Sequence, residues 1–179
     1  MGVEVCPVAR DGLCLFASAA HAICTQYTGR AELAPKVAEA LYANISVYAF
    51  EHQAESVGAR AVFRCFPQPG VTERRFGWHK AGADYLVPLV AATLGADIRL
   101  RRYDGGPTLS DGGTVTAETW TEVTGLESTP ASPMDQYFPD DGPQMPITIE
   151  LLHWATATQD LAEHYDPIVP PPTDAPAAE

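Results

Sequence analysis

The segment around which this sequence is organised is Ala9-Arg10-Asp11-Gly12-Leu13-Cys14-Leu15-Phe16-Ala17. A glycine two residues before a cysteine predicts a tight turn, and the apolar, alanine-rich residues that follow predict a helix that begins at Cys14. A helix N-terminus presents backbone N–H groups and the positive end of the helix dipole, and both favour a thiolate over a thiol. Cys14 is therefore a candidate nucleophile. The alternative is a small, buried apolar residue in the first turn of a helix.

A second motif lies near the other end of the chain and reads Glu163-His164-Tyr165-Asp166-Pro167-Ile168-Val169. His164 and Asp166 are two residues apart, so in a strand their side chains lie on the same face. A nucleophilic cysteine needs a base, and the base needs a group that orients it. We therefore predict that His164 is the general base and acid and that Asp166 orients it. The alternative for Asp166 is a turn residue before Pro167.

The two motifs in this order, Asp-Gly-x-Cys-Leu-Phe and then His-Tyr-Asp-x-Ile, closely resemble the OTU (ovarian tumour) family of cysteine proteases over roughly residues 5–169. The resemblance implies an α/β (α+β) domain with a papain-like arrangement, in which a small central sheet is flanked by helices and the cysteine lies at a helix N-terminus. It implies hydrolysis of isopeptide or peptide bonds at the C-terminus of ubiquitin or a ubiquitin-like protein. Two alternatives remain open: a polyprotein-processing protease of the same fold, and a catalytically weak module that binds ubiquitin.

The resemblance also assigns roles to the residues just before the cysteine. Asp11 is expected to help shape the oxyanion loop, although an N-cap of the following helix is an alternative that does not exclude this role. Gly12 is expected to allow a backbone conformation or a close approach that a Cβ would block. Leu13 is a departure, because OTU proteins often carry Asn at this position and a side-chain donor to the oxyanion would be missing. Lower activity, altered specificity and binding without cleavage all follow as possibilities.

Further residues are expected at the cleft on the same grounds. Trp78 and His79 occupy a region that borders the catalytic cleft in OTU-like proteins, and an aromatic residue such as Tyr165 commonly walls the narrow channel for the substrate's glycines. Among the other histidines, His153 is the main rival to His164 as the base, because it lies on the preceding predicted strand. It lacks the His-x-Asp spacing.

Composition limits the classes of partner. The 179 residues include 11 Lys and Arg against 23 Asp and Glu, which gives a formal net charge of −12. This charge argues against a nucleic-acid partner, since phosphate binding needs a basic surface, and it is compatible with the basic tail of ubiquitin. No apolar run reaches the roughly 18 residues of a membrane helix, and no signal-peptide pattern is present. We expect a monomer in the cytoplasm, or in a host's cytosol if the source is a pathogen.

Chain length and residue spacing give the domain limits. Residues 1–169 are expected to form one domain, and the Pro- and Ala-rich residues 170–179 are expected to be a disordered tail or linker. The cysteines have no spacing typical of metal ligands, so neither metal nor cofactor is expected. Cys24 is interpreted as helix packing.

Hydrophobic periodicity predicts the elements between the two motifs. Helices are expected at about 14–27, 33–55 and 84–94, the last capped by Asp84. Strands are expected within 3–9 and at 96–103, 147–154 and 164–169, and 114–123 is rich in β-favouring residues. Turns or loops are expected at 66–80, 104–113, 125–145 and 155–163.

Overall fold

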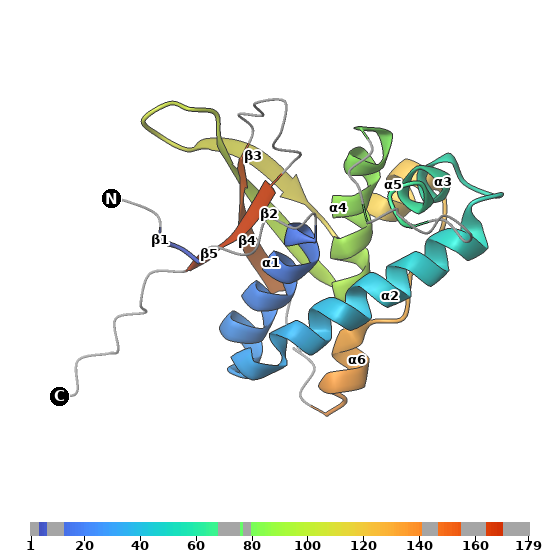
Figure 1. Ribbon diagram of the computed structural model, residues 1–179, viewed down its shortest axis with the longest axis horizontal. Helices are drawn as coiled ribbons and strands as arrows, with labels where there is room; N and C mark the ends of the chain where they lie inside the picture. The colour runs from blue at the N-terminus through green and yellow to red at the C-terminus, as the bar shows by residue number, and fades with distance from the viewer. Residues whose placement is uncertain are drawn as a thin grey trace.

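The computed structural model describes residues 4–6, 13–67, 76, 80–140, 147–154 and 164–169. Its helices are α1 (Cys14–Ile23), α2 (Ala34–His52), α3 (Val57–Phe63), α4 (Lys80–Leu94), α5 (Thr119–Thr124) and α6 (Pro133–Tyr137). Its strands are β1 (Glu4–Val5), β2 (Ala96–Tyr103), β3 (Ser110–Val115), β4 (Ile147–Trp154) and β5 (His164–Val169). In Figure 1 the sheet lies on one side and α2 to α6 gather on the other, so the chain has the predicted α+β class.

The described strands form one sheet in the order β1-β5-β4-β2-β3. β2 and β4 run parallel, while the other neighbouring pairs are antiparallel. In the β4–β5 pair, Trp154 lies directly opposite His164. β1 pairs with the far end of β5, at Ile168 and Val169. The strand end that carries His164 therefore lies away from the part of β5 that pairs with β1.

Helix α1 lies between the sheet and α2 (Figure 1) and contacts both α2 and β5. Its small side chains permit this position: Ser18, Ala19 and Ala20 are completely buried. The helix continues as a π-helical turn, Cys24–Thr28, and ends at Gly29, whose φ of 65° is left-handed. Glycine adopts this conformation without steric cost. The helix predicted at about 14–27 therefore ends close to its predicted end.

The hydrophobic core fills the space between the sheet and the helices. Its fully buried members from α2, α4 and the sheet include Val37, Leu41, Ile45, Leu86, Leu89, Ile98, Ile149 and Leu151. These residues recur at helical spacing in α2 and α4 and at alternate positions in β4. The core is thus built from the periodic patterns that are visible in the sequence.

Several predicted elements are confirmed. The strands predicted at 96–103, 147–154 and 164–169 are β2, β4 and β5 with the same bounds. The long helix predicted at 33–55 is α2, and Pro35 lies in its first turn, where a missing N–H costs little. The entry strand predicted within 3–9 is present as β1.

The start predicted for the helix at 84–94 was wrong. Asp84 does not cap this helix, because α4 already begins at Lys80 and includes Pro88 in its interior. A proline at this position removes a hydrogen bond to the carbonyl four residues earlier, which belongs to Asp84. Asp84 is exposed, so water is available to that turn of the helix. Exposure explains why the helix continues across a residue that normally ends one.

The β-favouring stretch 114–123 is a strand only as far as Val115, and Thr119–Thr124 forms helix α5. Trp120 explains the difference: its side chain is completely buried, and its indole N–H donates to the Tyr48 hydroxyl over 3.1 Å. Burial of this ring outweighs the weak β preference of its neighbours. The turn predicted at 104–113 also ends earlier than expected, because β3 begins at Ser110.

Two short helices were not predicted. Helix α3 begins after Ser56, whose hydroxyl accepts a hydrogen bond from the Ala59 N–H. Helix α6 lies inside the predicted loop 125–145 and begins after Ser132, whose hydroxyl accepts from the Met134 N–H. Serine is a favoured N-cap, so both starts carried a local signal. The loops predicted at 66–80 and 155–163 and the tail 170–179 lie largely or wholly outside the described residues.

Candidate active site

His164 and Asp166 form the centre of the candidate site. Both lie on β5, with His164 as its first residue. The His164 Nε2 and Asp166 Oδ1 atoms are 3.0 Å apart, and the two residues are only 5% and 3% exposed. The hydrogen bond predicted from their spacing is therefore present. The turn considered for Asp166 is wrong, since β5 continues through Pro167, and a proline itself holds the preceding residue extended.

A third side chain, which the sequence analysis missed, completes this network. The Trp154 Nε1 donates a hydrogen bond of 2.8 Å to Asp166 Oδ2. Trp154 is the last residue of β4, and its ring packs edge-on against Tyr103 with centroids 5.1 Å apart. The only signal in the sequence was a tryptophan at the end of the strand before the His-x-Asp motif. Its partner depends on strand register, which the sequence does not give.

Cys14 is the first residue of α1 and is 2% exposed. Two hydrogen bonds align α1 with β5: the Ser18 hydroxyl donates to the Tyr165 carbonyl over 2.8 Å, and the Gln26 amide donates to the Ile168 carbonyl over 3.2 Å. At the usual rise per residue, the helix advances about 12 Å between Ser18 and Gln26, and the strand advances about 10 Å between Tyr165 and Ile168. The two elements therefore run side by side in the same direction.

This alignment places the two motifs at the same end of two adjacent elements. Cys14 precedes Ser18 by one helical turn on the same face of α1, and His164 precedes Tyr165 by one residue. Going back from the Ser18–Tyr165 hydrogen bond along both elements leads to Cys14 on the helix and to His164 on the strand. Residues that are 150 positions apart in the sequence thus start two adjacent elements at the same end.

The N-terminus of α1 has an unusual cap. Leu13 is the N-cap residue, and its side chain makes no capping hydrogen bond. An apolar cap leaves the N–H groups of the first turn to acceptors other than the cap side chain. The N-cap position of α1 is Leu13 and not Asp11. Asp11 and Gly12 themselves lie outside the described residues, as do Trp78 and His79, so their roles stay predictions.

An apolar cavity of about 290 Å³ opens beside this helix tip. It is lined by Leu13, Phe16, Ala17, Pro35, Ala38, Glu39 and Tyr42. Phe16 and Tyr42 also belong to an aromatic cluster with Phe66 and Phe76, with ring centroids 4.9 to 6.3 Å apart. Burial raises the pKa of the Tyr42 phenol. Leu13 therefore lies both at the start of α1 and in the wall of this cavity.

The rival histidine, His153, lies opposite Tyr165 in the β4–β5 pair. Its ring stacks on the Tyr165 ring, with centroids 4.7 Å apart and planes 10° from parallel. Residues alternate between the faces of a strand, so His153 and Tyr165 lie on the face opposite to His164 and Asp166. Tyr165 is 2% exposed, and its predicted part in a substrate channel stays a prediction.

The other thiols differ from Cys14 in their surroundings. Burial raises the pKa of the Cys24 thiol to about 11, with a smaller contribution from the negative charge of Glu32. The Cys65 thiol is buried and donates to the Ala61 carbonyl over 3.7 Å. Neither cysteine begins an α-helix: Cys24 lies where α1 continues into the π-helical turn, and Cys65 follows the end of α3. Within the described ranges, no three His, Cys, Asp or Glu side chains come together as a metal site would require.

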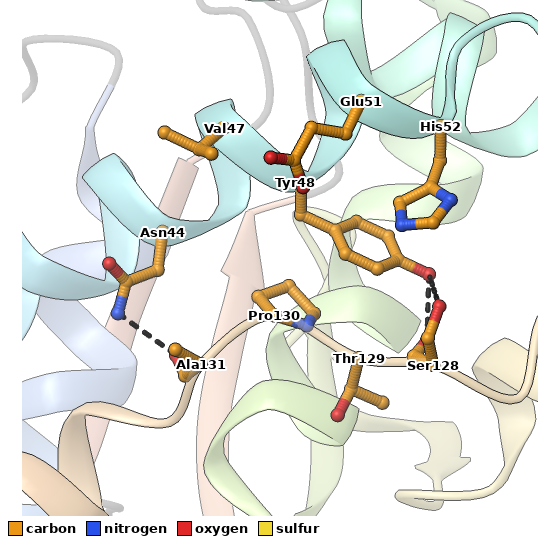
Figure 2. A pocket seen from close by; sticks show the side chains of 9 residues that line it. All are labelled: Asn44, Val47, Tyr48, Glu51, His52, Ser128, Thr129, Pro130 and Ala131. Carbon is orange, nitrogen blue, oxygen red and sulfur yellow. Dashed lines mark hydrogen bonds between the residues drawn. The ribbon is translucent and has the colours of Figure 1, made fainter.

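A second cavity, of about 280 Å³, lies between α2 and the segment that follows α5 (Figure 2). Two hydrogen bonds hold that segment in place: Asn44 Nδ2 donates to the Ala131 carbonyl over 2.9 Å, and the Tyr48 hydroxyl donates to the Ser128 carbonyl over 2.7 Å. Figure 2 shows the Tyr48 ring beside His52, and their centroids are 4.4 Å apart. No residue of α1, β4 or β5 lines this cavity, so it is separate from the candidate site.

The part of the chain that the structure describes contains no helix that is long and apolar enough to cross a membrane. Comparisons of the sequence and structure with protein-family models, with curated proteins and with solved structures give no match. The candidate site therefore stands on its own geometry: a cysteine that begins a helix, and a buried histidine–aspartate pair that begins the adjacent strand.

Proposed function

We propose that this chain is a cysteine hydrolase of the OTU type, which cleaves isopeptide or peptide bonds at the C-terminus of ubiquitin or a ubiquitin-like protein. The observation that carries the proposal is the buried hydrogen bond between His164 and Asp166, at the end of β5 that lies beside the start of α1. A nucleophile, a base and an orienting group are what acyl transfer by a thiol requires. The choice of ubiquitin as substrate rests on the resemblance of the two motifs.

The reaction proceeds through a thioester. The Cys14 thiolate attacks the carbonyl carbon of the substrate's terminal glycine, and backbone N–H groups at the start of α1 stabilise the oxyanion. His164 then gives its proton to the leaving amine as the C–N bond breaks. In the second half, His164 takes one proton from water, whose oxygen attacks the thioester. The C–S bond breaks, which releases the Cys14 thiolate and a carboxylic acid, and the acid loses its proton to the solvent. No metal or cofactor enters either step.

The partners and the compartment that we propose for this activity are based on the charge and composition of the chain. An acidic protein with a net charge of −12 attracts a substrate with a basic tail more readily than one with an acidic tail. We propose a monomeric enzyme that acts in the cytoplasm, or in a host's cytosol. Nucleic acid and membranes are not among the proposed partners.

The test is a reaction of the full chain with ubiquitin that carries an electrophile at its C-terminus. A covalent adduct on Cys14, lost in Cys14→Ala and kept in Cys65→Ala, is the expected result. Reversible binding without an adduct would favour a ubiquitin-binding module. No interaction at all would contradict the proposal and favour a protease that processes its own polyprotein.

A further inference from the structure

The Asp166 carboxylate accepts hydrogen bonds at both of its oxygens. Oδ1 lies 3.0 Å from His164 Nε2, and Oδ2 accepts from Trp154 Nε1 over 2.8 Å. Trp154 belongs to β4, where it lies directly opposite His164 across the strand pair. His164 is thus hydrogen-bonded to Asp166 on its own strand. Asp166 is in turn hydrogen-bonded to Trp154 on the neighbouring strand β4.

The chemistry of the indole decides the direction of this chain of hydrogen bonds. An indole N–H is a donor and cannot accept a hydrogen bond. Oδ2 must therefore act as an acceptor. When Asp166 is a carboxylate, Oδ1 can also only accept, so its hydrogen bond with the histidine requires a donor at His164 Nε2. In the neutral imidazole the proton is held on Nε2, and the lone pair lies on Nδ1.

We propose that Trp154 is a positioning residue that fixes the tautomer of His164 through Asp166. The proposal rests on the proposed function for its catalytic meaning, because the Nδ1 lone pair is then the one available to take the Cys14 proton. Trp154 touches neither substrate nor nucleophile in this scheme. It holds the orientation of the Asp166 carboxylate, with Oδ2 on the indole and Oδ1 on the histidine.

This proposal predicts a specific effect of the substitution Asp166→Asn on the His164 tautomer. An asparagine side chain has one acceptor end and one donor end. Trp154 requires the acceptor end, so the donating Nδ2 turns to His164 Nε2 and draws the ring into the other tautomer. Removing the indole N–H in Asp166→Asn/Trp154→Phe frees the amide to turn round, so that its oxygen again accepts from Nε2. The second substitution is therefore expected to repair the first.

The matched control is Trp120→Phe. Trp120 is a buried tryptophan whose Nε1 also donates a single hydrogen bond, to the Tyr48 hydroxyl over 3.1 Å, outside the candidate site. Replacing it removes the same chemical group and similar packing. In the Asp166→Asn background it is expected to lower stability and to restore nothing.

The primary measurement is the ¹⁵N chemical shifts of the His164 ring in the full chain, at a pH at which the ring is neutral. They are recorded in the Cys14→Ala background, so that no thiolate affects the ring. We expect the Nε2–H tautomer in the parent, the Nδ1–H tautomer in Asp166→Asn, and Nε2–H again when Trp154→Phe is added. An Nδ1–H parent, an unchanged tautomer in Asp166→Asn, or no return in the double variant would each overturn the proposal.

Kinetics provide a second measurement, with Cys14 intact. Asp166→Asn is expected to lower kcat by about a thousandfold or more, and Asp166→Asn/Trp154→Phe is expected to recover at least about tenfold of that loss, with KM unchanged. If Trp154 had only a structural role, the loss of activity from Trp154→Phe would add to the loss from Asp166→Asn. That result would contradict the proposal. The NMR result needs no substrate. An inactive parent with the expected tautomers would therefore defeat the proposed function and leave this inference standing.

Discussion

The Ser18 hydroxyl donates a hydrogen bond of 2.8 Å to the main-chain carbonyl of Tyr165, and both residues are buried. This contact joins α1, near the start of the chain, to β5, near its end. It lies one helical turn from Cys14 and one residue from His164. Of the two hydrogen bonds that align α1 with β5, the one from Ser18 is therefore the nearer to the candidate site.

Ser18→Ala is expected to lower the free energy of unfolding by about 1 kcal/mol, because it removes a buried hydrogen bond between α1 and β5. Urea unfolding measures this change. The control is Thr25→Ala, since the Thr25 hydroxyl bonds to the His21 carbonyl within its own helix at an exposed position. An equal loss in both variants would show that the Ser18 contact has no special weight.

Cys14→Ala is expected to reduce hydrolysis at least about a thousandfold, the scale of removing a catalytic nucleophile. Folding should change little, because the side chain loses one sulfur atom at a helix tip. The rate with a fluorogenic ubiquitin substrate and the circular dichroism spectrum measure the two effects. Retained activity in Cys14→Ala, together with loss in Cys65→Ala, would identify a different nucleophile.

His164→Ala is expected to match the loss of Cys14→Ala, whereas His153→Ala should keep most of the activity. The reason is the face of the sheet: His164 shares a face with Asp166, and His153 stacks on Tyr165 on the other face. Both rates are measured on proteins checked for folding. If His153→Ala is as inactive as His164→Ala while folded, the base is unassigned.

Cys24 is expected to resist alkylation in the native protein. Its pKa is raised to about 11, mainly by burial, so at pH 8 only about one thiol in a thousand is ionised, and the thiolate is the reactive form. Because the unfolded chain ionises this thiol first, Cys24 makes folding less favourable as the pH rises from about 9 toward 11. Mass spectrometry after iodoacetamide treatment checks the first effect. Rapid native labelling of Cys24 would contradict its burial.

The sequence by itself determined the elements that carry the chemistry. Alternating residues predicted β2, β4 and β5 with their observed bounds, and strand geometry placed His164 and Asp166 on one face. The turn before Cys14 and the apolar run after it predicted where α1 begins. These are local properties, set by the backbone period and by the residues next to it in the chain.

Only the tertiary structure decided which elements meet. Strand register placed Trp154 opposite His164 and its indole on Asp166, and the Ser18 contact set α1 against β5. Burial of Trp120 turned part of a β-favouring stretch into α5. Register and burial depend on residues that are far away in the chain. The sequence next to a given residue does not identify those distant partners. For that reason the sequence pointed to His164 and Asp166, while the hydrogen bond from Trp154 to Asp166 emerged only from the fold.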